Sequence, residues 1–312
     1  MSSVIFDRVA IIGLGLIGSS IGHAIKRSGL ARHIAGYART EETRATALEI
    51  GFIDSVHDTA SAAVEGADLT LICVPVGICG AVTKELGAAL KPGSIITDVG
   101  SVKQAVIDNM SPHVPEGVHF IPGHPIAGTE HSGPAAGFAT LFDGRWCILT
   151  PIAGTDAKAL QKLTAFWQGC GCKVDQMAAD HHDQVLAITS HLPQLIAYNI
   201  VGTVTELEED TQSEVTKFSA GGFRDFTRLA ASDPVMWRDI CIANRDAILE
   251  MLGRFTEDLT ALQRSIRRGD ADKLHDLFTR TRDMRARIVE AGQETPEVDF
   301  GRHVADDPGG DD

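Results

Sequence analysis

The stretch "VAIIGLGLIGSSIGHAI", residues 9–25, decides the fold of this chain. Four apolar residues that favour a strand run into three glycines with G-x-G-x-x-G spacing, and the residues after them favour a helix. The first glycine permits a tight turn, the second lets a pyrophosphate approach the backbone, and the third lets the helix pack closely on the strand. The amides and dipole at the start of the helix favour a phosphate. We therefore predict a dinucleotide-binding turn made of Gly13, Gly15, Leu16, Ile17 and Gly18.

Short β-rich runs alternate with helical stretches from residue 8 to about residue 175. This alternation predicts a parallel sheet with helices on both faces, whose ligands lie beyond the carboxyl ends of the strands. From about residue 179 helical periodicity takes over, and Ser232, Asp233 and Pro234 form a helix start. The expected strands are "RVAII" (8–12), "HIAGY" (33–37), "LTLICV" (69–74), "SIITDV" (94–99), "VHFI" (118–121), "RWCILT" (145–150) and "KV" (173–174).

The predicted fold class is therefore α/β, with an N-terminal doubly wound (Rossmann) domain followed by an all-helical C-terminal domain. We expect a nucleotide-binding domain at 1–178, a substrate and dimerisation domain at 179–293, and an acidic, disordered tail at 294–312. The segment "ICIANRDAILEMLGRF" (240–255) is apolar on more than one helical face. That excess of apolar surface predicts a homodimer through the helical domain.

The composition argues against several classes of function. A net charge of −14 disfavours nucleic acid as a partner, because phosphate binding needs a basic surface. We find no run of about 18 apolar residues and no basic-then-apolar leader, so we predict that the chain has neither a membrane span nor a signal peptide. We therefore expect a cytoplasmic protein. Six cysteines are scattered without metal-ligand spacing, which predicts reduced core cysteines and no metal site.

The second predicted strand ends in "AGYARTEE" (35–42), with Ala38 where an acid commonly accepts a hydrogen bond from the ribose 2′-hydroxyl. Without that carboxylate nothing repels a 2′-phosphate, and Arg39 is able to stack on the adenine or pair with the phosphate, beside Thr40. Alternatively, Arg39 is solvated and Glu41 or Glu42 serves the ribose of NAD. The pattern favours NADP over NAD.

Other strands end in residues that would face a bound nicotinamide. The third strand ends at Val74 and is followed by Pro75. Ser101 follows the fourth strand, and His124, in "GHPIAGTE" (123–130), follows the fifth. Because it lies between Gly123 and Pro125 at a strand's carboxyl end, His124 is a candidate for the chemistry. Nine other histidines are interpreted as satisfied or solvated: His23, His33, His57, His113, His119, His181, His182, His275 and His303.

The helical half adds His191 in "TSHLPQ" (189–194), and Arg224, Arg228 and Trp237 in "GGFRDFTRLAASDPVMW" (221–237). The two arginines are four residues apart, so they share one face of a helix. Two cations on one face of an acidic protein predict an anionic ligand.

Together these pieces resemble the prephenate and arogenate (cyclohexadienyl) dehydrogenases of tyrosine biosynthesis. The resemblance covers about residues 8 to 290 in the family's order. It implies NAD(P)-dependent oxidative decarboxylation of prephenate, arogenate or both: C4 loses hydride, the 4-hydroxyl loses its proton, and CO₂ departs as the ring becomes aromatic. The matching stretches are "GLGLIGSS" (13–20), "DVGSVK" (98–103), "GHPIAGTEHSG" (123–133), "SHLPQ" (190–194) and "FRDFTRLAASDPVMWRD" (223–239).

The resemblance also implies roles for individual residues. His124 accepts the hydroxyl proton, and Ser101 orients the hydroxyl, His124 or the nicotinamide. Arg228 holds the ring carboxylate, while Arg224 supports a second carboxylate or a neighbouring acid. The remaining substrate-site residues are His191, Thr129, Glu130 and Trp237, of which Glu130 and Trp237 close the site. Trp237 reaches the site from the same subunit or from the other one. Alternatively, Trp237 is an aromatic residue of the core or of the dimer interface.

Two other classes of function stay open at this point. Dehydrogenases of β-hydroxyacids or imines share the two-part build, but they rely on a lysine in the helical domain, and Lys217 lies outside any matching motif. A non-catalytic dinucleotide sensor would need neither the strand-end histidine nor the arginine pair. The pattern also departs from the family at Gln194, where many relatives carry a second histidine.

Overall fold

The structure, a computed structural model, describes residues 4–129 and 131–290. Two compact units divide the chain, one up to Leu252 and one from Gly253 onward. The first unit contains all the described strands and the helices up to residue 243, as well as the start of α12 (Arg245–Arg268). Each unit is considered separately below.

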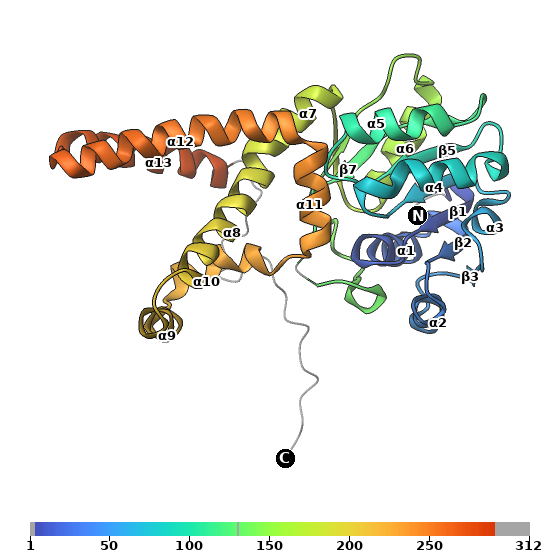
Figure 1. Cartoon of the computed structure of the whole chain (residues 1–312). Coiled ribbons are helices and arrows are strands. Elements are labelled where there is room, and N and C mark those ends of the chain that lie inside the picture. Colours follow the sequence, from blue (N-terminus) through green and yellow to red (C-terminus); the bar gives the residue numbers. More distant parts are fainter. Residues whose placement is uncertain (1–3, 130, 291–312) are drawn as a thin grey trace. The chain divides into compact units, whose positions relative to one another are not determined.

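A six-stranded parallel sheet forms the centre of the first unit, in the order β3-β2-β1-β4-β5-β6 (Figure 1). This order places the Gly13 turn at the centre, where the chain reverses its direction across the sheet, which is where doubly wound folds bind their ligands. The strands are β1 (Phe6–Ile12), β2 (Ala31–Tyr37), β3 (Ser55–Val56), β4 (Leu69–Ile72), β5 (Ile95–Asp98) and β6 (His119–Phe120).

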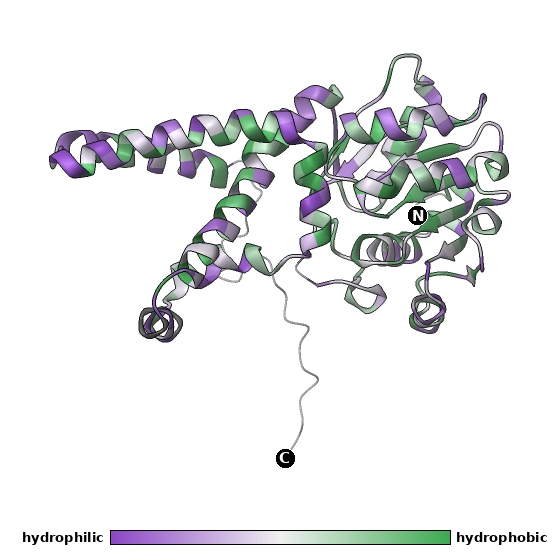
Figure 2. Ribbon diagram, in the orientation of Figure 1, coloured by the Kyte–Doolittle hydropathy of each residue, from purple (hydrophilic) through white to green (hydrophobic). Residues whose placement is uncertain are grey.

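Helices cover both faces of the sheet because neighbouring residues of a strand point in opposite directions. In β1, Val9 and Ile11 pack with α1 and α6, whereas Ala10 and Ile12 pack with α3, α4 and α5. Figure 2 shows the strands as largely hydrophobic ribbon between these layers. The helices are α1 (Leu16–Ser28), α2 (Glu41–Ile50), α3 (Ala60–Val64), α4 (Cys79–Leu86), α5 (Gln104–Met110) and α6 (Ala157–Gly169). The predicted α/β class is confirmed.

The sheet differs from the prediction beyond β6. After Phe120 the chain leaves the parallel sheet, and β7 (Gly123–Pro125), β8 (Trp146–Leu149) and β9 (Lys173–Gln176) form a separate three-stranded sheet. Strand β8 runs antiparallel to β7 and parallel to β9. His124 therefore lies within a strand, opposite Ile148, rather than just past a strand's end as we predicted. The expected strands at 145–150 and 173–174 exist but belong to this second sheet.

The helices after β9 begin at residue 179 and are α7 (Ala179–Leu186), α8 (Leu192–Thr205), α9 (Glu209–Phe218), α10 (Gly221–Thr227) and α11 (Pro234–Ala243). A wide turn, η5 (Ala187–His191), joins α7 to α8, and η6 (Arg228–Ala231) is a tight turn after α10. Asp233 caps α11 by accepting a hydrogen bond from Met236 N at 2.7 Å, which confirms the predicted helix start.

Among the described residues, one helical stretch is long and apolar enough to cross a membrane, Ala179–Thr205, which contains an 18-residue window with a mean hydropathy of 1.2. The sequence prediction overlooked it. The stretch is weak support for a membrane span, because the core helix of a soluble protein has the same length and composition. His182, Asp183 and His191 of this stretch are buried within the fold, and 33% of its apolar window is buried.

The second unit continues α12 and adds α13 (Ala271–Glu290). No residue of α13 is buried, and large apolar side chains are exposed on both helices. These exposed side chains are Leu259, Ile266, Phe278, Met284, Ile288 and Val289. Such a surface is typical of a helix that packs against another protein surface.

Candidate active site

The turn between β1 and α1 has the geometry that a bound pyrophosphate requires. A side chain at Gly13, where φ is +102°, would collide with the carbonyl of Cys73, and one at Gly18 would collide with the carbonyl of Gly13. A side chain at Gly15 would meet nothing within 4 Å, so this glycine faces open space. No side chain caps α1 at Gly15, which leaves the first amides of the helix available to an anion. The residues present therefore fit a dinucleotide.

The neighbouring loops complete the nucleotide side of the site. Val74 lies against the Gly13 turn, because the Val74 Cγ1 atom is 3.1 Å from where a Gly13 side chain would begin. Next to β2, Ala38 is buried while Arg39 and Thr40 are exposed. The Thr40 hydroxyl caps α2 by accepting a hydrogen bond from Thr43 N at 3.3 Å. Leu16 and Ile17 are half-buried in the first turn of α1, and Pro75 is exposed after β4.

Arg44, which the sequence analysis did not single out, braces the loop after β2. Its guanidinium donates to the carbonyl of Ala38 at 2.9 Å and forms an ion pair with Asp58 at 3.3 Å. Most of the Arg44 side chain is buried. Arg44 therefore holds the loop that carries Arg39 in place.

A buried ion pair fixes the loop between β5 and α5. The Lys103 ammonium contacts the Asp98 carboxylate and donates to the carbonyl of Gly123 at 2.7 Å. The Asp98 carboxylate also accepts from Gly100 N at 2.8 Å and from Gly123 N at 3.3 Å. These contacts tie β7 to the end of β5, so that the half-buried Ser101 and the strand with His124 are held on one frame.

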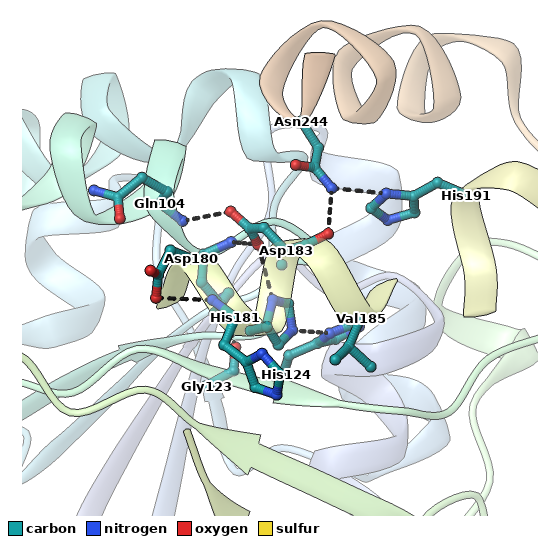
Figure 3. A network of polar contacts seen from close by, with 12 residues as sticks. Gln104, Gly123, His124, Asp180, His181, Asp183, Val185, His191 and Asn244 are labelled. Atoms are coloured by element: carbon teal, nitrogen blue, oxygen red, sulfur yellow. Dashed lines mark hydrogen bonds and ion pairs between the residues drawn. The ribbon is translucent and has the colours of Figure 1, made fainter. Parts of the chain in front are cut away.

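His124 is 8% exposed, and its Nδ1 atom is 2.9 Å from Nε2 of His182 on α7. Nδ1 of His182 is in turn 2.8 Å from Oδ1 of Asp183. The Asp183 carboxylate also accepts hydrogen bonds from the backbone amides of Lys103 at 2.7 Å and Gln104 at 2.9 Å. Figure 3 shows His124, Asp183 and Gln104 in this polar network.

A second branch of the network reaches His191. Asn244 Nδ2 lies 2.9 Å from the backbone carbonyl of Asp183 and 3.1 Å from Nδ1 of His191 (Figure 3). Because a carbonyl only accepts, the Asn244 atom that faces it must be the amide nitrogen, and this nitrogen also donates to His191 Nδ1. His191 then carries its hydrogen on Nε2, which is buried without a partner among the described residues.

Burial keeps all three histidines neutral at neutral pH. The pKa of His124 is lowered well below its usual value, first by burial and then by His182, Lys103 and His191. Burial also lowers the pKa of His191, to about 4. The pKa of His182 is lowered by burial as well, which outweighs the opposing effect of Asp183. A neutral imidazole can accept a proton, so His124 is in the state that a general base needs.

Two family models match the chain. One, described as the prephenate dehydrogenase nucleotide-binding domain, matches residues 21–176, and the other, the prephenate dehydrogenase dimerization domain, matches residues 178–280. The chain belongs to the prephenate dehydrogenase family.

Individual relatives agree with this assignment. A cyclohexadienyl dehydrogenase of Zymomonas mobilis is 43% identical over 88% of this chain and 93% of its own length. The crystal structure of prephenate dehydrogenase from Aquifex aeolicus with hydroxyphenyl propionate and NAD⁺ is 31% identical, with a TM-score of 0.84 over 92% of this chain and 99% of that one. Arogenate dehydrogenase of Synechocystis is 28% identical, with a TM-score of 0.76 over 90% of this chain and 99% of that one.

In this family member the two predicted arginines lie on another segment, α10 and η6. Arg228 begins η6 and is half-buried, whereas the Arg224 side chain on α10 is exposed. The hydrogen bond from Arg228 N to the Arg224 carbonyl keeps them one helical turn apart, although the helix tightens at Arg228. Gln194 of α8 donates to the carbonyl of Leu229 at 2.5 Å, so the residue that departs from the family pattern anchors the turn with Arg228.

The other predicted substrate residues are placed as follows. Trp237 of α11 lies edge-on to His191 of the same chain, with ring centroids 6.0 Å apart, and its Nε1 is buried without a partner among the described residues. Thr129 is exposed, and its hydroxyl accepts a hydrogen bond from His131 N at 3.3 Å. Glu130 lies outside the described residues.

The sequence analysis did not include His182 in the site. We counted it among the satisfied or solvated histidines, and it is indeed buried with both ring nitrogens hydrogen-bonded, but one of its partners is His124. Asp183, Lys103 and Asn244 were not singled out either. The only signal for His182 and Asp183 was their adjacency in "HHD" (181–183), and that pattern does not show which other strand or helix the pair will meet.

Proposed function

We propose that the chain is an NAD(P)-dependent dehydrogenase that oxidatively decarboxylates prephenate, arogenate or both, to 4-hydroxyphenylpyruvate or tyrosine. The bound cofactor would supply a nicotinamide ring that accepts the hydride from C4 of the substrate. The chain itself would take up the 4-hydroxyl proton and hold the carboxylate until CO₂ departs. Names of relatives at 43% and 35% identity, a cyclohexadienyl and a prephenate dehydrogenase, support this activity.

The observation that carries the proposal is the state of His124. Its ring is neutral, buried and held through a hydrogen bond at Nδ1. Its Nε2 atom has no hydrogen bond to a described residue and is not fully shielded from solvent. The free nitrogen is thus the one open to a ligand. A general base in this position accelerates a reaction by about 10²–10⁴-fold.

We propose the remaining roles from the family resemblance, with which the donors and charges of these side chains are consistent. His191 offers a buried Nε2–H to a substrate oxygen, and Trp237 packs beside it and helps to close the site with Glu130. Arg228 binds the ring carboxylate, and Arg224 a second carboxylate or a neighbouring acid. Ser101 orients the hydroxyl, His124 or the nicotinamide from the loop after β5. Thr129, in the segment after β7, contributes to substrate binding.

For the cofactor we propose a preference for NADP. The buried Ala38 places no carboxylate beside the ribose, and the exposed Arg39 is able to pair with a 2′-phosphate, beside Thr40. The dinucleotide would lie on the turn from Gly13 to Gly18, against Val74, Pro75 and Ser101. Replacing Ala38 by Asp should shift the preference toward NAD, because a carboxylate accepts from the 2′-hydroxyl and repels a 2′-phosphate. An unchanged ratio of kcat/KM for NADP and NAD would contradict this preference.

We also propose a cytoplasmic homodimer formed through the helical segment, in which residues 1–178 bind nucleotide and residues 179–293 bind substrate and the second subunit. The match of residues 178–280 to a dimerization domain supports it. So do the exposed apolar side chains of α12 and α13, which include Ile266 and Phe278.

The decisive experiment measures kcat/KM by absorbance at 340 nm with prephenate and arogenate, each with NAD and NADP, and a β-hydroxyacid as control. We expect turnover with at least one cyclohexadiene and none with the β-hydroxyacid. His124→Asn should lower kcat by about 10²–10⁴-fold while KM stays within a few-fold. Turnover of the β-hydroxyacid alone, or a His124→Asn variant with most of its kcat, would contradict the proposal.

A further inference from the structure

His182 and Asp183 make contacts that hold the ring of His124 in one protonation form. We infer that His182 and Asp183 are positioning residues that fix His124 as the tautomer with hydrogen on Nδ1, so that Nε2 presents a lone pair to the substrate. The inference rests on the proposed role of His124 as the base. It assigns a function to a buried histidine and aspartate outside the predicted site.

The direction of the hydrogen bonds follows from Asp183. Its carboxylate oxygens accept from three donors: the amides of Lys103 and Gln104, and Nδ1 of His182. An ionised carboxylate has no hydrogen to give, so His182 must donate through Nδ1. A neutral His182 then has an unprotonated Nε2, which faces His124 at 2.9 Å and can only accept. His124 must therefore donate from Nδ1, and its own Nε2 is left unprotonated.

Burial and further hydrogen bonds hold each side chain of this hydrogen-bonded series in one orientation. His182 is fully buried, and the Asp183 side chain is 7% exposed. The two amides that Asp183 binds lie at the start of α5, next to the Lys103 ammonium, whose charge is balanced by Asp98. His191, which also lowers the pKa of His124, has its hydrogen-bonding pattern set by Asn244. The ring orientation of His124 thus depends on contacts from β7, α5 and α7.

The same arrangement suits the proton-transfer step. When Nε2 of His124 takes the 4-hydroxyl proton, the O–H bond breaks, an N–H bond forms, and the ring becomes a cation that still donates from Nδ1 to His182. The hydride would pass to the nicotinamide of a bound cofactor, and CO₂ would depart while the electron pair of the broken C–C bond enters the ring. The resulting phenolate oxygen takes the proton back from Nε2, so that atoms and charge balance and His124 returns to its neutral form. The cation faces the acceptor nitrogen of His182, with the Asp183 carboxylate beyond it, and is stabilised there.

The first test uses ¹⁵N-histidine NMR of the full chain without substrate, with His124 assigned by comparison with His124→Asn. We expect Nδ1 protonated and Nε2 unprotonated at neutral pH. In Asp183→Asn the new amide is able to donate to Nδ1 of His182, which reverses the chain of donors and moves the His124 hydrogen to Nε2. A wild-type His124 with hydrogen on Nε2, or no change in Asp183→Asn, would overturn the inference whatever the activity.

The second test is kinetic. Asp183→Asn should lower kcat by roughly 10²-fold or more, as loss of the correct tautomer does elsewhere, and His182→Gln by about 10²-fold, with KM within about 3-fold in both. His181→Gln, an exposed neighbour on the same helix, is the matched control and should leave kcat unchanged.

A double-mutant cycle separates positioning from general support of the fold. If His182 acts through His124, adding His182→Gln to His124→Asn should change kcat by less than about 2-fold. An equal loss in both backgrounds would show that His182 only supports the fold and would overturn the inference. Should His124→Asn itself keep full activity, the proposed function fails, while the NMR result still decides the tautomer.

Discussion

Single residues determine how the substrate and cofactor would be held, and the glycine turn shows how far such residues are predictable. The G-x-G-x-x-G spacing correctly indicated a strand, a tight turn and a helix, because each glycine answers a local steric demand. His182 was missed because its role depends on a contact with His124, 58 residues earlier in the chain. Local patterns carry no information on such pairs.

The two arginines give a prediction at this scale. If Arg228 holds the ring carboxylate, Arg228→Ala should cost about 2–5 kcal/mol of substrate binding, because it removes a charge-assisted pair. That loss raises KM roughly 30-fold or more. Arg228→Lys should rescue only part of it, since a point charge does not reproduce the guanidinium fork. Arg224→Ala is the control, and a larger KM effect at Arg224, or a raised cofactor Kd, would show that Arg228 has been given the wrong role.

The glycines of the nucleotide turn differ in what they tolerate. Gly15→Ala should leave the melting temperature within about 2 °C, because nothing lies within 4 Å of the new carbon, yet weaken cofactor binding severalfold by filling the approach to the helix N-terminus. Gly18→Ala should lower both stability and binding, since its new carbon would lie 2.0 Å from the Gly13 carbonyl. Thermal melts and cofactor titrations of both variants check this. Equal loss of stability in both would contradict it.

Elements, rather than residues, account for the largest difference between the prediction and the structure. The sequence after β6 indicated a continuing parallel sheet, yet β7 pairs antiparallel with β8. Pairing between segments more than 20 residues apart depends on which strand is available in space, and short strands such as β7 give a weak periodic signal. The helices were easier to predict, because caps such as Asp233 and Thr40 act within a few residues.

The junction of β7, α7 and η5 predicts how stability depends on pH. His124, His182 and His191 have pKa values in the folded state below the usual 6.5. The unfolded chain therefore binds protons first as the pH falls. The free energy of unfolding should be highest above about pH 6.5 and should decline toward about pH 4. Each histidine contributes a slope of up to about 1.4 kcal/mol per pH unit.

Urea unfolding between pH 4.5 and 7.5 checks this. His182→Gln should flatten the slope, whereas His181→Gln, which changes an exposed histidine, should not. A free energy of unfolding that stays constant from pH 7.5 to pH 5 would contradict the prediction. For activity, the lowered pKa of His124 places the acidic limb of kcat/KM below about pH 6.5, the value for a free histidine.

At the scale of the whole molecule, assembly is the main question. If α12 and α13 form the subunit interface, Ile266→Glu combined with Phe278→Glu should convert a dimer into monomers in analytical ultracentrifugation, because two charges would enter an apolar contact. Gln263→Glu adds a charge at an exposed polar position of α12 and is the control. A double variant that remains dimeric would place the interface elsewhere.

The hydrogen bond between His124 and His182 joins two parts of the chain that match separate family models, since His124 falls within 21–176 and His182 within 178–280. Under the proposed roles, one part supplies the base and the other aligns it. Any rotation that draws the two parts away from each other lengthens this 2.9 Å contact and frees the imidazole to adopt either form. If His124 is the base, proton abstraction should therefore require the two parts to be in contact.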